Sequence, residues 1–173
     1  MRRGSTIEQW LKPLAAAENQ AYLTNALQVA DVLDWILDQL GVCSVWQTSF
    51  SISEEFLRRL YFIRQGGQIK EFSLVLDMKA TNKTIALWPF ITQVITKTYL
   101  ADNHSKILLV QSVKGEVVTV ITSQNLTRGN RTESAFVSTD LNIFRTIKSQ
   151  IDDLITNHSV PLNEVYRDRI GAD

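Results

Sequence analysis

The chain lacks the residues from which several kinds of site are built. Cys43 is the one cysteine among 173 residues, which excludes an internal disulfide and a cluster of thiolate metal ligands. We expect it to be a half-buried free thiol. No stretch approaches the roughly 18 consecutive apolar residues of a membrane-spanning helix, and the basic start is not followed by the apolar core of a signal peptide. We therefore expect a cytoplasmic protein with no membrane partner.

An excess of charge of either sign is also absent. Lysine and arginine together number 18, and so do aspartate and glutamate. A chain with this balance has no overall positive field to attract nucleic acid, so any basic surface must be local. Hydrophobic residues make up 45% of the sequence, which is enough for the core of one globular domain of this length.

The hydrophobic pattern of the first hundred residues predicts helices that alternate with strands. Gly41 is placed to end a long amphipathic helix, and Ser51 with Glu54 fits a capping box at the start of another. Alternation of this kind favours a sheet whose faces are covered by crossover helices. The expected elements are a helix over residues 18–40, a strand over 44–52, a helix over 54–64, a strand over 71–78 and a helix over 82–96.

The second half of the sequence changes to strands joined by short turns. Lys114 and Gly115 form a tight turn between two apolar stretches, which predicts a hairpin, and Asp140 is placed to cap a last helix before a polar tail. The fold class is therefore α/β, with a mixed β-sheet of about six strands flanked by helices. The elements expected here are strands over residues 98–100, 107–113, 117–122 and 134–137 and a helix over 141–156.

Five polar residues fall at the ends of the predicted hairpin. His104 and Lys106 lie two residues apart where its first strand begins, so both side chains should project to the same side. The antiparallel return brings Ser123 and Asn125 beside them. A nucleophile, a cation and neutral donors in one place suit phosphoryl transfer, where the protein orients the nucleophile and stabilises charge on phosphate oxygens. Glu133 is the candidate to fix the second imidazole nitrogen.

This constellation resembles the active-site motif of the phospholipase D superfamily. The H-x-K element is His104 and Lys106, the S-x-N element is Ser123 and Asn125, and the downstream acid is Glu133. The resemblance covers about residues 100–137 and implies a phospholipase D-like half-unit with an extra N-terminal helix. We accordingly divide the chain into an N-terminal helical segment, a phospholipase D-like domain and a C-terminal tail, within one globular domain. Their bounds are residues 1–43, 44–158 and 159–173.

The resemblance also implies a mechanism. Members of this superfamily cleave phosphodiester bonds through a histidine nucleophile without a metal or another cofactor, and a complete site needs two copies of the motif. This chain carries one copy, so a homodimer with a composite site is expected. His104 would form a phosphohistidine, and Glu133 would orient it. Lys106, Ser123 and Asn125 would hold the phosphate. Small one-motif members that dimerise are commonly nucleases, which implies a nucleic-acid substrate.

Two departures from the family pattern leave other functions open. Gln111 stands where the family usually has an aspartate, and Thr122 stands where a glycine often precedes the serine. A glutamine keeps hydrogen bonds but loses the charge. The alternative is a catalytically inactive dimeric module of the same fold that binds phosphate or nucleic acid or has a structural role. A phospholipase is a further alternative.

Single residues of the motif also have plainer explanations. His104 alone would suit a solvated loop, Lys106 would suit an edge strand that resists aggregation, and Glu133 could form a surface ion pair. These explanations are strained when they must hold for all five residues together. A local basic patch for nucleic acid could be supplied by Lys83, Arg128 and Arg131.

Overall fold

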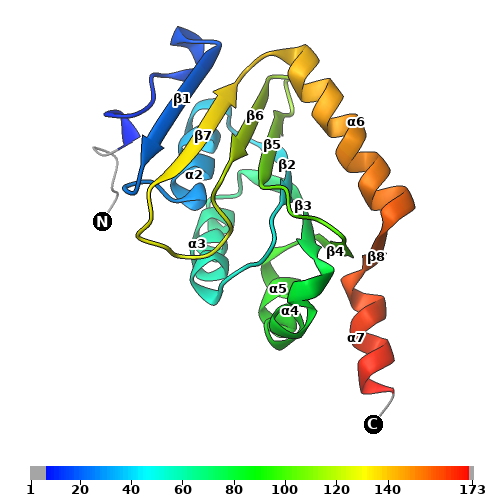
Figure 1. Cartoon of the computed structure of the whole chain (residues 1–173). Coiled ribbons are helices and arrows are strands. Elements are labelled where there is room, and N and C mark those ends of the chain that lie inside the picture. The colour runs from blue at the N-terminus through cyan, green and yellow to red at the C-terminus, as the bar shows by residue number, and fades with distance from the viewer. Residues whose placement is uncertain (1–6, 172–173) are drawn as a thin grey trace.

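A single mixed β-sheet organises the part of the chain that the computed structural model describes, residues 7–171 (Figure 1). Within these residues the sheet has eight strands in the order β1-β7-β6-β5-β2-β3-β4-β8. The predicted α/β class with a mixed sheet flanked by helices is confirmed, but the sheet is wider than expected. The strands are β1 (Asn19–Thr24), β2 (Cys43–Thr48), β3 (Ile69–Asp77), β4 (Lys97–Ala101), β5 (Ile107–Ser112), β6 (Val117–Thr122), β7 (Glu133–Ser138) and β8 (Ser159–Pro161).

Helices cover both faces of the sheet. They are α2 (Val29–Leu40), α3 (Glu54–Gln65), α4 (Thr81–Ala86), α5 (Trp88–Val94), α6 (Leu141–His158) and α7 (Leu162–Ile170). On one face α2, α3 and α5 supply buried side chains such as Ile36, Leu57 and Ile91 to the larger core, while α6 packs on the other face around Phe144 and Ile151. Among residues 7–171, no helix combines the length and the apolar character needed to cross a membrane.

The centre of the sheet is parallel, and the strands on both sides of it are antiparallel. β2, β3 and β4 run parallel because α3 and the α4–α5 pair provide the crossovers, whereas β5, β6 and β7 follow as antiparallel hairpins. The carboxyl ends of the three parallel strands therefore meet at one edge, the usual place for a site in such sheets. Cys43 begins β2 and is completely buried as a free thiol, not half-buried as expected.

The helix predicted over residues 18–40 is wrong in its first part. Residues 19–24 form β1, which pairs antiparallel with β7 at the edge of the sheet, and only the second part forms α2. Tyr22 and Thr24 are buried while Leu23 between them is exposed, which is the two-residue period of a strand. The predicted end of the helix is confirmed, since Gly41 follows α2 with a φ of 77°.

Two other helix predictions need correction. α3 is capped by Ser53, whose hydroxyl accepts a hydrogen bond from the Phe56 amide at 3.2 Å, and not by Ser51. The single helix over residues 82–96 is divided into α4 and α5. Pro89 lies in the first turn of α5, and because proline has no N–H to continue a helix, the break falls just before it.

The segment expected to be a polar tail forms ordered structure. β8 pairs with β4 through residues such as Val160 opposite Leu100, and α7 follows it. Leu162 is buried, and the rings of Tyr166 and Trp88 stack with centroids 4.0 Å apart and planes 3° apart. The last described helix is thus fixed to α5 by an aromatic contact.

Candidate functional site

Three loops meet at the edge where the parallel strands end. Residues 102–106 connect β4 to β5, residues 123–132 connect β6 to β7, and Ser49 and Phe50 follow β2 directly. The hairpin closes as predicted, because the Thr122 amide donates a hydrogen bond to the carbonyl oxygen just before β5 at 3.0 Å. The H-x-K and S-x-N segments therefore lie at the same edge of the sheet.

His104 is exposed at this edge. Its ring packs edge-on against Phe50, with centroids 5.4 Å apart and planes at 71°. Among residues 7–171 neither imidazole nitrogen makes a hydrogen bond, so both remain open to a substrate or a second chain. Lys106 lies in the loop before β5 and its Nζ donates to the His104 carbonyl oxygen at 2.7 Å, so the strand alternation predicted for these two residues does not apply.

Asn103, which immediately precedes the histidine, is the residue that fixes this loop. It is 5% exposed. Its backbone N–H donates to Asp77 Oδ2 at 3.0 Å, and its side-chain Nδ2 donates to the Ser49 carbonyl oxygen at 3.1 Å. Its Oδ1 accepts from the Ser105 amide at 3.2 Å and from the Ser105 hydroxyl at 2.5 Å. The side chain thereby ties the histidine loop to the end of β2, and the backbone amide of Asn103 ties it to the end of β3.

Asn125 is oriented by residues that follow β2. Its Oδ1 accepts from the Phe50 amide at 3.2 Å and lies 3.4 Å from the Ser49 hydroxyl, whose single hydrogen is donated to the Ser51 carbonyl oxygen at 2.8 Å. The same hydroxyl accepts from the Leu126 amide at 3.1 Å. Because its carbonyl oxygen accepts from the Phe50 amide, the side chain turns its Nδ2 hydrogens to the other side, as a phosphate ligand requires.

Ser123 and Glu133 are brought together at the base of the β6–β7 loop. The Ser123 hydroxyl donates to Glu133 Oε2 and accepts from the Ser134 amide at 3.1 Å. The predicted contact between Glu133 and His104 stays a prediction, since in residues 7–171 the hydrogen-bond partner of Glu133 is this serine.

The histidine and asparagine loops share one support. Ser49 accepts from the Asn103 side chain on its carbonyl oxygen and, on its hydroxyl oxygen, from the backbone amide of Leu126, the residue after Asn125. Phe50 contacts the ring of His104 and donates its amide to Asn125. Two consecutive residues after β2 thus hold both halves of the predicted motif in register.

Gln111, the departure from the family pattern, lies away from this support. It is in β5 opposite Ser44 and Val117, near the end of that strand remote from His104. Thr122 is part of the site edge, where its hydroxyl donates to the Ser134 carbonyl oxygen at 2.8 Å. Neither residue replaces a group that contacts the histidine or the asparagine.

A groove of about 1340 Å³ adjoins the site between α2, α3 and the β6–β7 loop. One wall is formed by residues 125–128 and 130, so the groove reaches Asn125 but not His104. Five carboxylates and three basic side chains line it, and Arg128 is paired with Glu55 at 3.3 Å. The groove is therefore acidic overall. Within the described residues, no three His, Cys, Asp or Glu side chains are placed to hold a metal ion.

Sequence reasoning missed Asn103, Ser49, Phe50 and Asp77. The available signal was position, because polar residues directly after buried strands often line a site at the edge of a parallel sheet. Sequence reasoning also missed Arg59 of α3, which pairs with Asp31 of α2 at 2.8 Å.

Comparison with known proteins is informative at the level of structure. No family model matches the chain, and no curated protein matches it in sequence. The structure of Nuc from Salmonella typhimurium, a phospholipase D family member, superposes with a TM-score of 0.63 at 16% identity, covering 83% of this chain and 96% of Nuc. The chain has the phospholipase D superfamily fold.

Two more structures are similar to this chain. NucT from Helicobacter pylori has a TM-score of 0.58 at 13% identity, covering 81% of this chain and 96% of NucT. TrmBL2, an archaeal chromatin protein with a novel mode of DNA binding, has a TM-score of 0.56 at 9% identity, covering 90% of this chain and 62% of TrmBL2. Nuc and NucT are each matched over nearly their whole length, so the fold that they share with this protein spans most of the chain.

Proposed function

We propose that the protein is a metal-independent phosphodiesterase, acting on nucleic acid, whose active site is completed by a second copy of the chain. The observation that carries this proposal is the shared support of His104 and Asn125 by Ser49 and Phe50. A solvated loop histidine would not need a buried asparagine beside it. The fold, the five motif residues and this support agree.

The proposed reaction has two displacement steps. A ring nitrogen of His104 from one chain attacks phosphorus, a nitrogen–phosphorus bond forms, and the phosphorus–oxygen bond to the leaving group breaks. The partner's His104 gives the leaving oxygen its proton. That neutral histidine then takes a proton from water, whose oxygen attacks phosphorus and releases the first histidine. One histidine must begin neutral and the other protonated, so the rate should follow a bell-shaped pH profile.

The remaining motif residues stabilise charge on the phosphate oxygens. Asn125 offers Nδ2 because its carbonyl oxygen is already bound, and Lys106 can exchange its hydrogen bond to the His104 carbonyl for one to phosphate. Ser123 would assist. The open imidazole nitrogens are what a nucleophile and a proton donor on a twofold axis require.

Nucleic acid is the proposed substrate because small one-motif members of the family are commonly nucleases. The charge of the groove beside Asn125 argues against this substrate, because the groove is acidic and Arg128 is paired with Glu55. A noncatalytic nucleic-acid-binding module is the second candidate. The hydrogen bond from Ser123 to Glu133 favours it, because that carboxylate is then engaged away from the histidine, and TrmBL2 has the same fold.

The test is hydrolysis of an aryl phosphodiester and of single- and double-stranded DNA, each with a chelator present. The chain has two histidines, so His158→Ala, at an exposed position, is a matched control for His104→Ala. Chelator-resistant hydrolysis that is lost in His104→Ala and kept in His158→Ala supports the enzyme. DNA binding without hydrolysis by the unaltered protein supports the binding module.

Mixing experiments test the composite site. After subunit exchange between equal amounts of unaltered and His104→Ala protein, a site that needs both histidines retains about one quarter of the activity, whereas chains acting alone retain about one half. Sedimentation must at the same time show a dimer. A monomer that hydrolyses the ester at every concentration contradicts the composite site.

A further inference from the structure

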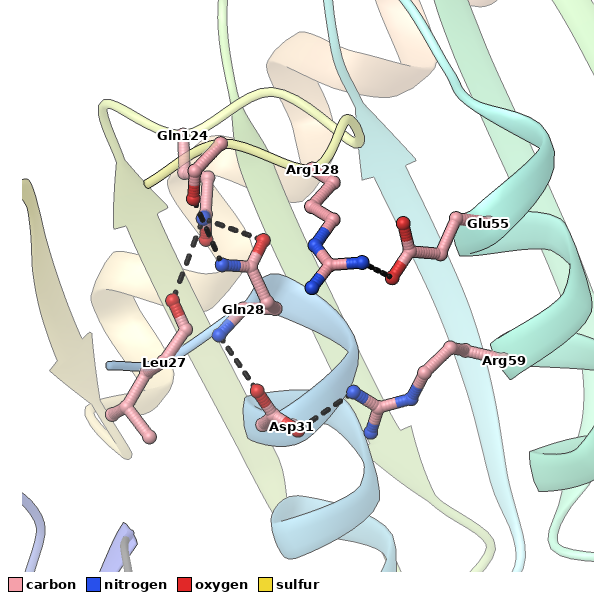
Figure 2. Close-up of polar contacts among 8 residues, drawn as sticks. Leu27, Gln28, Asp31, Glu55, Arg59, Gln124 and Arg128 are labelled. Carbon is pink, nitrogen blue, oxygen red and sulfur yellow. Dashed lines mark hydrogen bonds and ion pairs between the residues drawn. The ribbon is translucent and has the colours of Figure 1, made fainter. Parts of the chain in front are cut away.

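The middle residue of the S-x-N segment, Gln124, points into the protein and not toward the proposed substrate. Its side chain is 4% exposed. Its Nε2 donates to the Gln28 side-chain oxygen at 3.0 Å and to the Leu27 carbonyl oxygen at 3.4 Å (Figure 2). Both acceptors stand at the start of α2, about a hundred residues earlier in the chain.

Gln28 contacts the loop at a second place. Its own Nε2 donates to the Gly129 carbonyl oxygen at 3.3 Å, while its Oε1 accepts from Gln124. One amide side chain therefore uses its donor on one arm of the β6–β7 loop and its acceptor on the other. Asn125 lies on the stretch between these two arms.

Gln28 is itself fixed by groups on two helices. It is the N-cap residue of α2, and its backbone amide donates to Asp31 Oδ2 at 2.7 Å. The other oxygen of Asp31 accepts from Arg59 of α3 at 2.8 Å (Figure 2). The Asp31 side chain is only 16% exposed, so this pair is partly shielded from solvent. The Gln28 side chain that binds the loop is thus fixed, through Asp31, to both α2 and α3.

Two separate groups of residues hold the β6–β7 loop, one after β2 and one at the start of α2. Phe50 donates to the side-chain oxygen of Asn125, Ser49 accepts from the next backbone amide, and Gln28 binds the two arms of the loop. We propose that Gln28 and Gln124 are positioning residues that set where Asn125 meets the phosphate. This proposal rests on the proposed function of Asn125. Neither glutamine contacts the substrate.

The test uses Gln28→Met and Gln124→Met, which keep side-chain length and remove the amide hydrogen bonds. The control is Gln39→Met on the same helix, because Gln39 also makes two side-chain hydrogen bonds, to the Leu14 amide and the Trp35 carbonyl, but none to the loop. We expect each of the two loop variants to lower kcat on the aryl phosphodiester about tenfold, since small displacements of a charge-stabilising group act on the transition state. KM and the two pKa values of the pH profile should not change.

Two results make the outcome decisive. The double variant Gln28→Met/Gln124→Met should lose less activity than the product of the two single losses, because the two side chains share a hydrogen bond that either substitution removes. Backbone hydrogen exchange of residues 123–130 should accelerate about tenfold in both single variants and stay unchanged in Gln39→Met. Equal exchange and equal kcat in Gln28→Met and Gln39→Met would overturn the proposal. If the unaltered protein hydrolyses nothing, the proposed function fails, and hydrogen exchange alone still decides whether Gln28 holds the loop.

Discussion

Asn103→Ala is the substitution that most directly tests how the histidine loop is held. It removes the donor to the Ser49 carbonyl oxygen and the acceptor for the Ser105 amide, at a position that is 5% exposed. Each shielded group left without a partner costs about 1–3 kcal/mol, and partial access of water to this edge favours the lower half of that range, so we expect a loss of about 3 kcal/mol. The corresponding fall in Tm is about 6–12 °C for a chain of this length.

Urea unfolding followed by tryptophan fluorescence measures this loss. Asn157→Ala is a matched control, because Asn157 makes one hydrogen bond, to Asp153, from an exposed position on α6, and we expect a change within about 0.5 kcal/mol. In the phosphodiester assay Asn103→Ala should lower kcat about a hundredfold, since His104 adjoins the lost anchor. An unfolding free energy and a rate both equal to those of Asn157→Ala would refute the role assigned to Asn103.

Three further predictions concern parts of the molecule away from the histidine. Burial, with a smaller contribution from a nearby glutamate, raises the pKa of the Cys43 thiol to about 11, so the fold favours the protonated form. The stabilisation is complete below the ordinary thiol pKa and is lost as pH rises toward 11, and Cys43→Ala should flatten the fall in unfolding free energy measured between pH 8 and 10. Ser53→Ala should cost about 1 kcal/mol in urea unfolding as the loss of a helix cap, while a comparable cost for Ser51→Ala would contradict the observed cap. Tyr166→Ala should cost about 1 kcal/mol and shift Trp88 emission to longer wavelength, and an unchanged spectrum would argue against the ring stack.

Local chemistry explains which elements were predictable. The Lys114-Gly115 turn and the Asp140 cap depend on residues within a few positions of each other, and both are observed, the Asp140 carboxylate accepting from the Asn142 amide at 2.7 Å. Residues 19–24 were misread because Leu23 fits a helical stripe with later leucines. The burial of Tyr22 on the opposite face depends on β7, more than a hundred residues away, and no local pattern contains that information.

The site divides in the same way. The motif residues are recognisable because their types and spacing match the pattern of the phospholipase D superfamily. Asn103 and Ser49 are supports, and their role depends on the order of strands in the sheet, which brings residues 54 positions apart into hydrogen-bonding distance. The role of Gln28 could not be predicted for the same reason, because its two contacts with the loop join residues 96 and 101 positions apart.

The two edge strands, β1 and β8, extend the folded sheet beyond the stretch of sequence that carries the motif. β1 covers the outer side of β7, and β8 covers the outer side of β4, each at an opposite margin of the sheet (Figure 1). A chain cut to residues 44–158 would keep every motif residue and uncover the backbone donors and acceptors of β7 along six residues and those of β4 along three. Unprotected margins of this kind recruit further strands from other molecules. Shortened versions of the protein should therefore precipitate or form fibrils even when their catalytic residues are intact.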